Sequence, residues 1–237
     1  ENIEKLKSRG VKFIEPEEGE LACKTNGPGR LANLDTILER VNSHFKQFHD
    51  LHGLRILVTA GPTHEPLDPV RFISNPSSGK MGYAVAEQAK VRGAEVVLIS
   101  GPTHLKPPTG VDFKACKTAG EMNSLVQQCF PQCDVLVMSA AVGDFTAEKL
   151  EKEKIKKRGK EGQTLNLVPT KDILMEVSKI KTQQFVVGFA AETQNLIQSA
   201  LEKLRSKRLD LIVANDISSP GIGFQSDNNQ VTLVDSN

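Results

Sequence analysis

Hydrophobic and polar residues follow two different patterns along the chain, and the change comes near residue 50. The first fifty residues are mostly polar and hold one amphipathic stretch, whereas apolar runs recur at intervals from Leu54 onward. We therefore predict a small separate unit over residues 1–50 and a larger domain over residues 51–237.

The first unit has one clear helical pattern. Asn33 has the side chain of a helix N-cap, and apolar residues follow it at helical spacing: Leu34, Ile37, Leu38, Val41, Phe45 and Phe48. Before this helix we expect a short helix that ends at Gly10, a brief strand over Val11–Ile14 and a polar loop to Arg30.

The second domain alternates apolar strands with helices. Helices are predicted over residues 79–92, from Thr118 to about Phe130 (where Glu121 gives capping-box spacing), from residue 170 or 171, and between the strands over residues 185–190 and 209–214. Strands are predicted over residues 54–60, 94–100, 134–140, 185–190, 209–214 and 231–234. Strands that are apolar throughout are buried on both faces. The fold class is therefore α/β, with a doubly wound, mostly parallel, Rossmann-like sheet and helices on both of its faces.

Composition and charge exclude several classes of protein. Hydrophobic residues make up 38% of the chain, which excludes a fully disordered protein. The net charge of +1 argues against nucleic acid or a membrane surface as partner. No apolar run reaches the roughly 18 residues of a membrane helix, and no signal-peptide pattern opens the chain. The cysteines are too few and too irregularly spaced for a disulfide framework, so we expect a cytoplasmic protein with structural thiols: Cys23, Cys116, Cys129 and Cys133.

Ligands of doubly wound sheets bind beyond the carboxyl ends of the strands. After the first strand, Ser77, Ser78 and Gly79 stand where a helix begins, and free backbone N–H groups there favour a phosphate. Gly79 and Gly82 would let a phosphate approach the backbone closely. The alternative is a capped helix whose glycines pack on the sheet.

Two familiar nucleotide-binding patterns are missing. A lysine follows Gly79 as in a P-loop, but Ser74 stands at the first glycine position and Met81 comes after the lysine. The second strand ends without the acidic residue that binds a dinucleotide ribose. The single tyrosine, Tyr83, has Glu87 four positions later instead of the lysine of a short-chain dehydrogenase.

Three further features each allow two interpretations. Asp144, after the third strand, could hold a ribose, a base amine or Mg²⁺, or it is an ordinary loop carboxylate. Lys203 and Lys207 share one helix face and could grip a polyphosphate, or they are solvated. The charged run over residues 148–160 is a solvated loop or a lid that closes over a phosphate ligand.

Several longer motifs are similar to those of one family: Val58–Asn75 with Ser77–Gly82, Lys154–Lys157, Val187–Thr193, Leu209–Asp216 and Gly223–Asn229. In this order, over about residues 53–237, the chain resembles the phosphopantothenate–cysteine ligase (phosphopantothenoylcysteine synthetase) half of bacterial bifunctional coenzyme A biosynthesis proteins.

The resemblance implies an enzyme that ligates 4′-phosphopantothenate to L-cysteine at the expense of CTP, with Mg²⁺. The carboxylate attacks the α-phosphate and releases pyrophosphate, and the cysteine amine then displaces CMP from the acyl-cytidylate. Such chemistry needs alignment and charge neutralisation more than a nucleophilic side chain. The resemblance also implies a homodimer, in which the loop that carries Lys154–Lys157 acts as a flap near the partner subunit.

The resemblance assigns residues by motif position. Asn75 would bind the acyl carbonyl, Arg71 would support its loop or contact the substrate, and Lys154 would act on the nucleotide in the first half-reaction. The phosphate or substrate loop would comprise Ser77, Ser78, Gly79 and Ala141. The CTP site would be lined by Met138, Ser139, Ala140, Asp144, Lys154, Lys171, Asp172, Ile173, Leu174, Phe189, Lys203 and Lys207. The metal ligands stay unassigned.

Residues 1–50 resemble the tail of the other half of such proteins, the FMN-dependent phosphopantothenoylcysteine decarboxylase. Cys23 matches the proton donor of its substrate clamp and would be a relic, although Lys24 and Thr25 replace the usual Gly-Asp. The flavin-binding domain is not in this sequence, so we expect it in a longer parent protein and expect neither FMN nor decarboxylase activity here. We also expect the ligase domain to end short at its carboxyl end.

Two other functions compete with the ligase. One is an NAD(P)-dependent oxidoreductase on a Rossmann sheet. The missing acidic residue after the second strand and the missing lysine four positions after Tyr83 argue against it. The other is an inactive binding or assembly module, against which the intact Asn75, Asp144 and Lys154 count.

Overall fold

The computed structural model describes residues 2–20, 26–46, 49–157, 162–192, 196–216 and 230–236. It forms two compact units, Glu1–Asp50 and Leu51–Asn237. The functional names predicted for these two parts stay predictions.

The first unit contains two helices and an antiparallel hairpin: α1 (Asn2–Ser8), β1 (Glu17–Glu20), β2 (Asn26–Arg30) and α2 (Leu34–Lys46). The Asn33 cap is confirmed, because its Oδ1 accepts a hydrogen bond from the Asp35 N–H at 3.0 Å. The strand predicted over Val11–Ile14 is wrong, since this segment is exposed and pairs with no described strand. The polar loop predicted up to Arg30 is also wrong, because it holds the hairpin. Cys23 and Phe48 lie outside the described residues.

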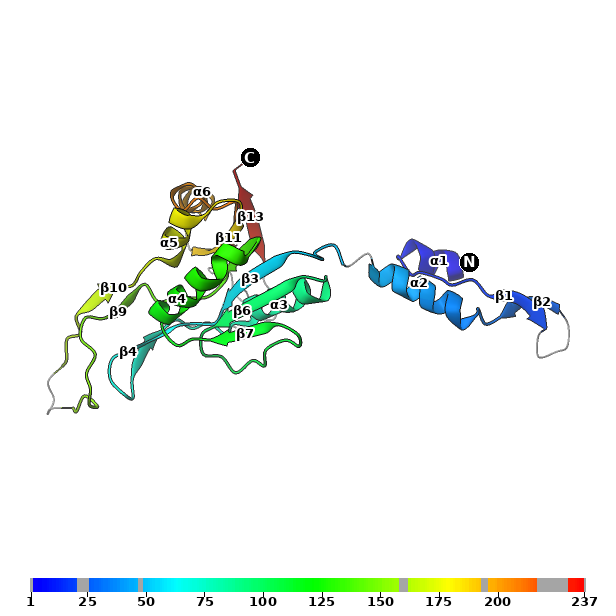
Figure 1. The fold of residues 1–237 in the computed structure, drawn as a ribbon. Helices are drawn as coiled ribbons and strands as arrows, with labels where there is room; N and C mark the ends of the chain where they lie inside the picture. Colours follow the sequence, from blue (N-terminus) through cyan, green and yellow to red (C-terminus); the bar gives the residue numbers. More distant parts are fainter. Residues whose placement is uncertain are drawn as a thin grey trace. The chain divides into compact units, whose positions relative to one another are not determined.

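The second unit is built on one seven-stranded sheet in the order β13-β12-β11-β8-β3-β6-β7 (Figure 1). Every neighbouring pair is parallel except β12 with β13. The strands are β3 (Arg55–Ala60), β6 (Glu95–Ser100), β7 (Asp112–Ala115), β8 (Val135–Met138), β11 (Phe185–Glu192), β12 (Leu211–Asp216) and β13 (Val231–Asp235). The predicted Rossmann-like α/β fold is confirmed.

Helices cover both faces of this sheet. Alternate strand residues face one core with Tyr83 and Ala86 of α3, and the others face a second core with residues of α4, α5 and α6, such as Val126. Adjacent Val58 and Leu57 of β3 belong to these two different cores. This explains why the central strands are mostly apolar on both faces instead of alternating apolar and polar residues. The helices are α3 (Lys80–Val91), α4 (Ala119–Cys129), the short 3₁₀ helix η1 (Phe130–Gln132), α5 (Ile173–Ile180) and α6 (Leu196–Ser206).

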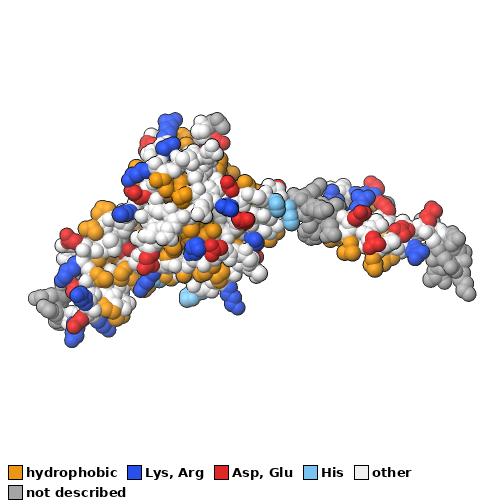
Figure 2. Space-filling view, in the orientation of Figure 1, with side chains coloured by type: hydrophobic (Ala, Val, Ile, Leu, Met, Phe, Trp, Pro, Cys, Tyr) orange, Lys and Arg blue, Asp and Glu red, His pale blue; other side chains and the backbone are white. Residues whose placement is uncertain are grey.

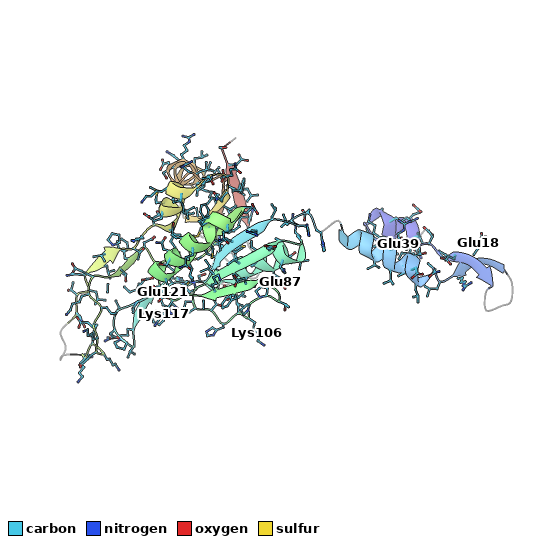
Figure 3. All side chains as sticks on the ribbon, in the orientation of Figure 1. Glu18, Glu39, Glu87, Lys106, Lys117 and Glu121 are labelled. Atoms are coloured by element: carbon cyan, nitrogen blue, oxygen red, sulfur yellow. The ribbon has the colours of Figure 1, made fainter. Side chains whose placement is uncertain are left out.

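The start of α4 follows the predicted capping box. Thr118 Oγ1 accepts a hydrogen bond from the Glu121 N–H at 3.2 Å, and the Glu121 carboxylate accepts one from the Thr118 N–H at 3.4 Å. The same carboxylate accepts the Lys117 N–H at 2.6 Å, and Figure 3 shows both side chains at this end of α4. The box therefore fixes where the helix begins.

Two short antiparallel hairpin-like pairs extend from the carboxyl end of the sheet. They are β4 (His64–Pro66) with β5 (Phe72–Ser74), and β9 (Phe145–Ala147) with β10 (Leu167–Pro169). Strand β4 packs against β9, and Figure 1 shows both at the same end of the unit. Neither pair was predicted, because three-residue strands are too short to show a period of two.

Charges of both signs are mixed over the visible surface (Figure 2), in keeping with the net charge of +1. Lys and Arg side chains gather where β9 and β10 lie in Figure 1, near the charged run. Among the described residues, no helix has both the length and the apolar character needed to cross a membrane.

Candidate functional site

The sheet changes direction of winding between β3 and β8. From β3 the chain moves outward to β6 and β7, and then returns to β8 on the other side of β3 before continuing to β11 and β12 (Figure 1). A crevice for ligands forms beyond the carboxyl ends of the strands at such a switch point. The loops after β3 and β8 are the two that meet there.

Backbone hydrogen bonds join these two loops. The Ala141 N–H donates to Gly61 O at 2.9 Å, and the Thr63 N–H donates to Ala141 O at 3.3 Å. The buried Thr63 hydroxyl then accepts the Gly143 N–H at 2.8 Å. The loop that carries Ala141 and Asp144 is therefore held against the loop that carries Asn75.

Asn75 lies across the same junction. Its Nδ2 donates to Ala141 O at 3.2 Å and to Val142 O at 3.1 Å. Both amide hydrogens are used, and Oδ1 remains as an acceptor. To donate to an acyl oxygen, Asn75 must therefore give up one of these two hydrogen bonds.

The predicted phosphate loop leads directly into α3. Gly79 has φ of 80° and precedes the first helical residue, Lys80. The Gly79 N–H donates to Ser77 Oγ at 3.3 Å, and the Lys80 N–H donates to Ser78 Oγ at 3.4 Å. These long hydrogen bonds to local hydroxyls are weak, so an anion at this helix end could replace them.

The residues at the end of β8 pack closely against β3. Ser139 Oγ donates to Thr59 O at 2.7 Å, and Thr59 Oγ1 accepts the Ala140 N–H at 3.2 Å while donating to Met138 Sδ at 3.4 Å. Met138 is buried in the core. The contribution of this segment to a ligand is therefore made by backbone and small side chains.

Asp144 stands at the exposed edge of the junction. Its backbone O accepts the Thr170 N–H at 2.9 Å, and Thr170 Oγ1 donates to Gly143 O at 2.6 Å. These bonds hold the segment that leads into α5 beside the loop after β8. Among the described residues, the Asp144 carboxylate has no recorded partner, so it is available to a ligand.

The start of α5 gathers several of the predicted CTP-binding residues. Asp172 caps the helix by accepting the Met175 N–H at 3.1 Å, and it pairs with Lys207 Nζ at 2.7 Å. Burial alone would raise the pKa of Asp172, but the hydrogen bonds from Lys207 and the helix N–H groups hold it below its usual range. Lys203 in α6 is half-buried, and the side chain of Lys207, which directly follows the helix, is 24% exposed, so neither lysine is fully solvated.

Other predicted CTP-site residues belong to the cores. Ile173 is buried and Leu174 packs beside it on the α4–α6 side of the sheet, whereas Phe189 packs on the α3 side. Lys171 is exposed. The structure therefore does not bring the side chains of Ile173 and Phe189 together, and only their backbone could meet one ligand.

Arg71 lies at the β4–β5 turn and is bound within the protein. Its Nη2 donates to the buried carboxylate of Asp68 and to Ile155 O, both at 2.6 Å. Of the two predicted roles, support of a loop is the one that these contacts fit. Lys154, next to Ile155, is exposed and has no ion-pair partner among the described residues.

Sequence reasoning missed four polar residues that hold the site together: Thr59, Thr63, Asp68 and Thr170. Thr59, Thr63 and Asp68 fall inside the long motif Val58–Asn75, and their place in this motif was the available signal. Burial alone would raise the pKa of Asp68, but hydrogen bonds from Ile155, Arg71 and Val70 hold it far below its usual range.

The hydroxyl of Tyr83 is held inside the protein. The side chain is buried, its hydroxyl donates to Ser100 Oγ at 3.2 Å, and it accepts from Thr103 Oγ1 at 3.1 Å. The hydroxyl is fully occupied, which weighs against a role as the proton donor of an oxidoreductase.

The described residues offer limited fit to a divalent cation. They contain no group of three or more His, Cys, Asp or Glu placed to hold a metal. Mg²⁺ commonly takes one or two carboxylates together with substrate phosphates and waters. Asp144 fits that arrangement as the carboxylate beside a nucleotide.

These features define a Rossmann-like domain whose ligand edge lies at the switch point of the sheet. The model of the family described as the DNA/pantothenate metabolism flavoprotein C-terminal domain matches residues 51–237, and the chain belongs to this family.

Individual relatives agree with this assignment. The chain is 46% identical over 235 residues to the coenzyme A biosynthesis bifunctional protein CoaBC of Escherichia coli and to that of Bacillus subtilis. These alignments cover 98% of this chain but only 58% of each relative's length. The crystal structure of the C-terminal domain of a CoaBC protein superposes with a TM-score of 0.66 at 42% identity, covering 78% of this chain and 83% of that one.

Proposed function

We propose that this chain carries the ligase step of coenzyme A biosynthesis, in which 4′-phosphopantothenate is joined to L-cysteine with CTP as co-substrate. The observation that carries the proposal is the meeting of the Asn75, Ala141–Asp144 and Thr170–Asp172 segments at the switch point of a domain of this family. The names of the CoaBC relatives supply the pathway.

The chemistry assigned to the residues follows from their positions. The phosphopantothenate carboxylate attacks the α-phosphate of CTP, and pyrophosphate leaves. The exposed ammonium of Lys154 would neutralise charge on the phosphates at this step, without covalent chemistry. The cysteine amine then attacks the acyl carbonyl, loses a proton and displaces CMP. The Asn75 amide would hold the acyl oxygen in place of one of its two backbone acceptors, Ala141 O or Val142 O.

The remaining ligand contacts belong to the same proposal. The helix end at Ser77–Gly79 would take a phosphate, and Asp144 would hold Mg²⁺ that the nucleotide brings with it. Bound Mg²⁺ would supply charge neutralisation on the phosphates. A homodimer, a cytoplasmic location and a flavin-binding domain in a longer parent protein stay predictions.

The test is pyrophosphate release from CTP with 4′-phosphopantothenate and Mg²⁺, with and without cysteine, and with ATP in place of CTP. We expect release that requires phosphopantothenate and favours CTP. Lys154→Gln should slow pyrophosphate release, whereas Asn75→Asp should spare it and slow product formation with cysteine.

The matched control for Lys154→Gln is Lys106→Gln, since Lys106 is an exposed lysine on the loop after β6 (Figure 3). It should behave as the wild type. If folded wild-type protein releases no pyrophosphate with either nucleotide, the ligase proposal is wrong for this chain. NAD(P)H binding, followed by its fluorescence, would favour the oxidoreductase, and binding of substrates without turnover would favour the inactive module.

A further inference from the structure

The β4–β5 turn is organised around the carboxylate of Asp68. The Leu67 N–H donates to Arg71 O at 2.9 Å and closes the turn. Asp68 Oδ1 accepts the N–H groups of Val70 at 2.8 Å and Arg71 at 2.7 Å. One carboxylate oxygen is therefore sufficient to shape the turn.

The other oxygen of Asp68 reaches a distant part of the chain. Oδ2 accepts the Ile155 N–H at 3.0 Å, and it also accepts Arg71 Nε at 3.0 Å and Nη2 at 2.6 Å. Arg71 Nη2 donates in addition to Ile155 O at 2.6 Å. Both backbone groups of Ile155 are thus held by one buried carboxylate and its arginine.

A second contact holds the same segment of the chain four residues before Ile155. The Glu151 N–H donates to Leu67 O at 3.0 Å. The segment between Glu151 and Ile155 is therefore attached to the β4–β5 turn at both ends. Lys154 lies in this segment, directly before the residue whose two backbone groups are fixed.

Burying a carboxylate is costly unless it is paired and hydrogen-bonded. The Asp68 side chain is fully buried, with 0% of its surface exposed, whereas its partner Arg71 is 47% exposed. The turn itself uses only Oδ1. Its second oxygen serves the connection to Ile155, which is 87 residues away in the sequence.

We propose that Asp68 is a positioning residue that, through Arg71 and Ile155, places Lys154 for the nucleotide step. This proposal rests on the proposed ligase function, and Asp68 itself touches no substrate. It also assigns Arg71 to the support of Lys154 rather than to substrate contact. A displacement of about 1 Å can cost roughly 100-fold in rate.

The experiment compares Asp68→Asn, Lys154→Gln and their double variant in steady-state pyrophosphate release. Asparagine keeps the Oδ1 acceptor of the turn but cannot accept from Ile155 and Arg71 as a carboxylate does. We expect Asp68→Asn to lower kcat by about 10- to 100-fold with little change in KM for phosphopantothenate. The double variant should be no slower than Lys154→Gln, because Asp68 acts only through Lys154.

A measurement independent of activity follows hydrogen exchange at the Ile155 amide. In Asp68→Asn it should exchange at least about 10-fold faster than in the wild type, while amides of the core strand β3 keep their protection. The matched control is Asp112→Asn, which removes the ion pair of Asp112 with Lys114 at 3.0 Å on β7. It should change neither kcat nor exchange at Ile155.

Multiplicative losses in the double variant, or unchanged exchange at Ile155, would overturn the proposal. If Asp68→Asn does not fold, Arg71→Gln replaces it in both measurements with the same expectations, because it removes the bond to Ile155 O and leaves the buried carboxylate its N–H donors. If the wild-type protein is inactive, the proposed ligase function is wrong. Hydrogen exchange at the Ile155 amide would then still show whether Asp68 fixes the segment that carries Lys154.

Discussion

Lys207 Nζ lies 2.7 Å from Asp172 Oδ2 and joins the end of α6 to the cap of α5. The Lys207 side chain is 24% exposed and that of Asp172 is 44% exposed. The pair lies where a nucleotide is proposed to bind. The Asp172 carboxylate and the nucleotide phosphates would therefore compete for the ammonium of Lys207. This conflict can be measured both in the protein alone and with the nucleotide.

In the protein alone, the pair should contribute modestly to the free energy of unfolding. Lys207→Met keeps the apolar stem, and Asp172→Asn keeps a good helix cap. A double-variant cycle in urea should give a coupling of about 0.5 kcal/mol, since both groups are partly solvated. Because the pKa of Asp172 is lowered on folding, the coupling should be present above about pH 4 and vanish as the pH falls further.

The more exposed pair Arg55–Glu95, with 59% and 72% exposure, is the matched control. Its coupling should be close to zero. An equal coupling in both pairs would contradict a special role for burial at Lys207.

With the nucleotide, the two variants should act in opposite directions. Lys207→Met should weaken CTP binding by about 10-fold, because a phosphate contact is lost. Asp172→Asn should strengthen it by about threefold, because the carboxylate no longer competes for the ammonium. Titration calorimetry would check both, and weaker binding to Asp172→Asn would show that the carboxylate itself contacts the ligand.

Gly82 is a point of close approach between α3 and the sheet. A Cβ on Gly82 would lie 2.6 Å from the Ala60 Cβ and 2.6 Å from Ser139 Oγ. Gly82→Ala should therefore destabilise the protein by about 1–3 kcal/mol through overpacking. It should also weaken CTP binding, because the helix start at Ser77–Gly79 would move. Urea unfolding and calorimetry would measure the two effects.

Gly120→Ala is the control for this substitution. Gly120 also lies in the first turn of a helix, but its added Cβ would have only Thr118 Oγ1 nearby, at 3.9 Å. It should raise the unfolding free energy by about 0.5 kcal/mol, as alanine restricts the unfolded chain. A similar loss for both variants would point to helix-start effects instead of contact with the sheet.

The variant Tyr83→Phe distinguishes the ligase hypothesis from the oxidoreductase hypothesis. It removes hydrogen bonds to Ser100 and Thr103 and should cost about 1 kcal/mol in urea unfolding. Pyrophosphate release should stay close to that of the wild type, because the ligase chemistry needs no proton from a hydroxyl that is already occupied by Ser100 and Thr103. Complete loss of activity from a folded variant would mean that Tyr83 takes part in the chemistry.

The sequence predicts the sheet well because its strands are apolar on both faces. Leu57 and Val58 enter different cores, so the strand shows a continuous apolar stretch instead of alternating apolar and polar residues. The edge strand Asp112–Ala115 is mostly exposed and lacks this signal. The error at Val11–Ile14 is the opposite one, because a strand was predicted where none forms. Apolar residues form a strand only where a neighbouring strand pairs with them.

The candidate site is predicted in part, and the reason for the gaps is distance along the chain. Motif position indicates Asn75 and the helix start after Ser78. Thr63 bonds to Gly143, 80 residues later, and Asp68 bonds to Ile155 across 87 residues. No local pattern encodes such pairs, because the folded sheet brings them together. Whether these residues bind CTP stays a prediction.

The three described cysteines are free thiols, and burial raises their pKa values. Burial, with the charge of Glu121, raises the pKa of Cys116 to about 12, and burial raises that of Cys133 to about 12 as well. At pH 8 only about one thiol in ten thousand is then a thiolate at these sites. We expect Cys116 and Cys133 to resist alkylation in the folded protein.

The measurement is the rate of iodoacetamide labelling at pH 8, read by mass spectrometry in a Cys23→Ser background, which removes the cysteine outside the described residues. Urea should expose all three thiols to rapid labelling. Since unfolded thiols ionise near pH 8.5 and those of folded Cys116 and Cys133 near 12, the unfolding free energy should fall as the pH rises through this window. Rapid labelling of Cys133 without urea would mean that the core around α4 opens more readily than its packing implies.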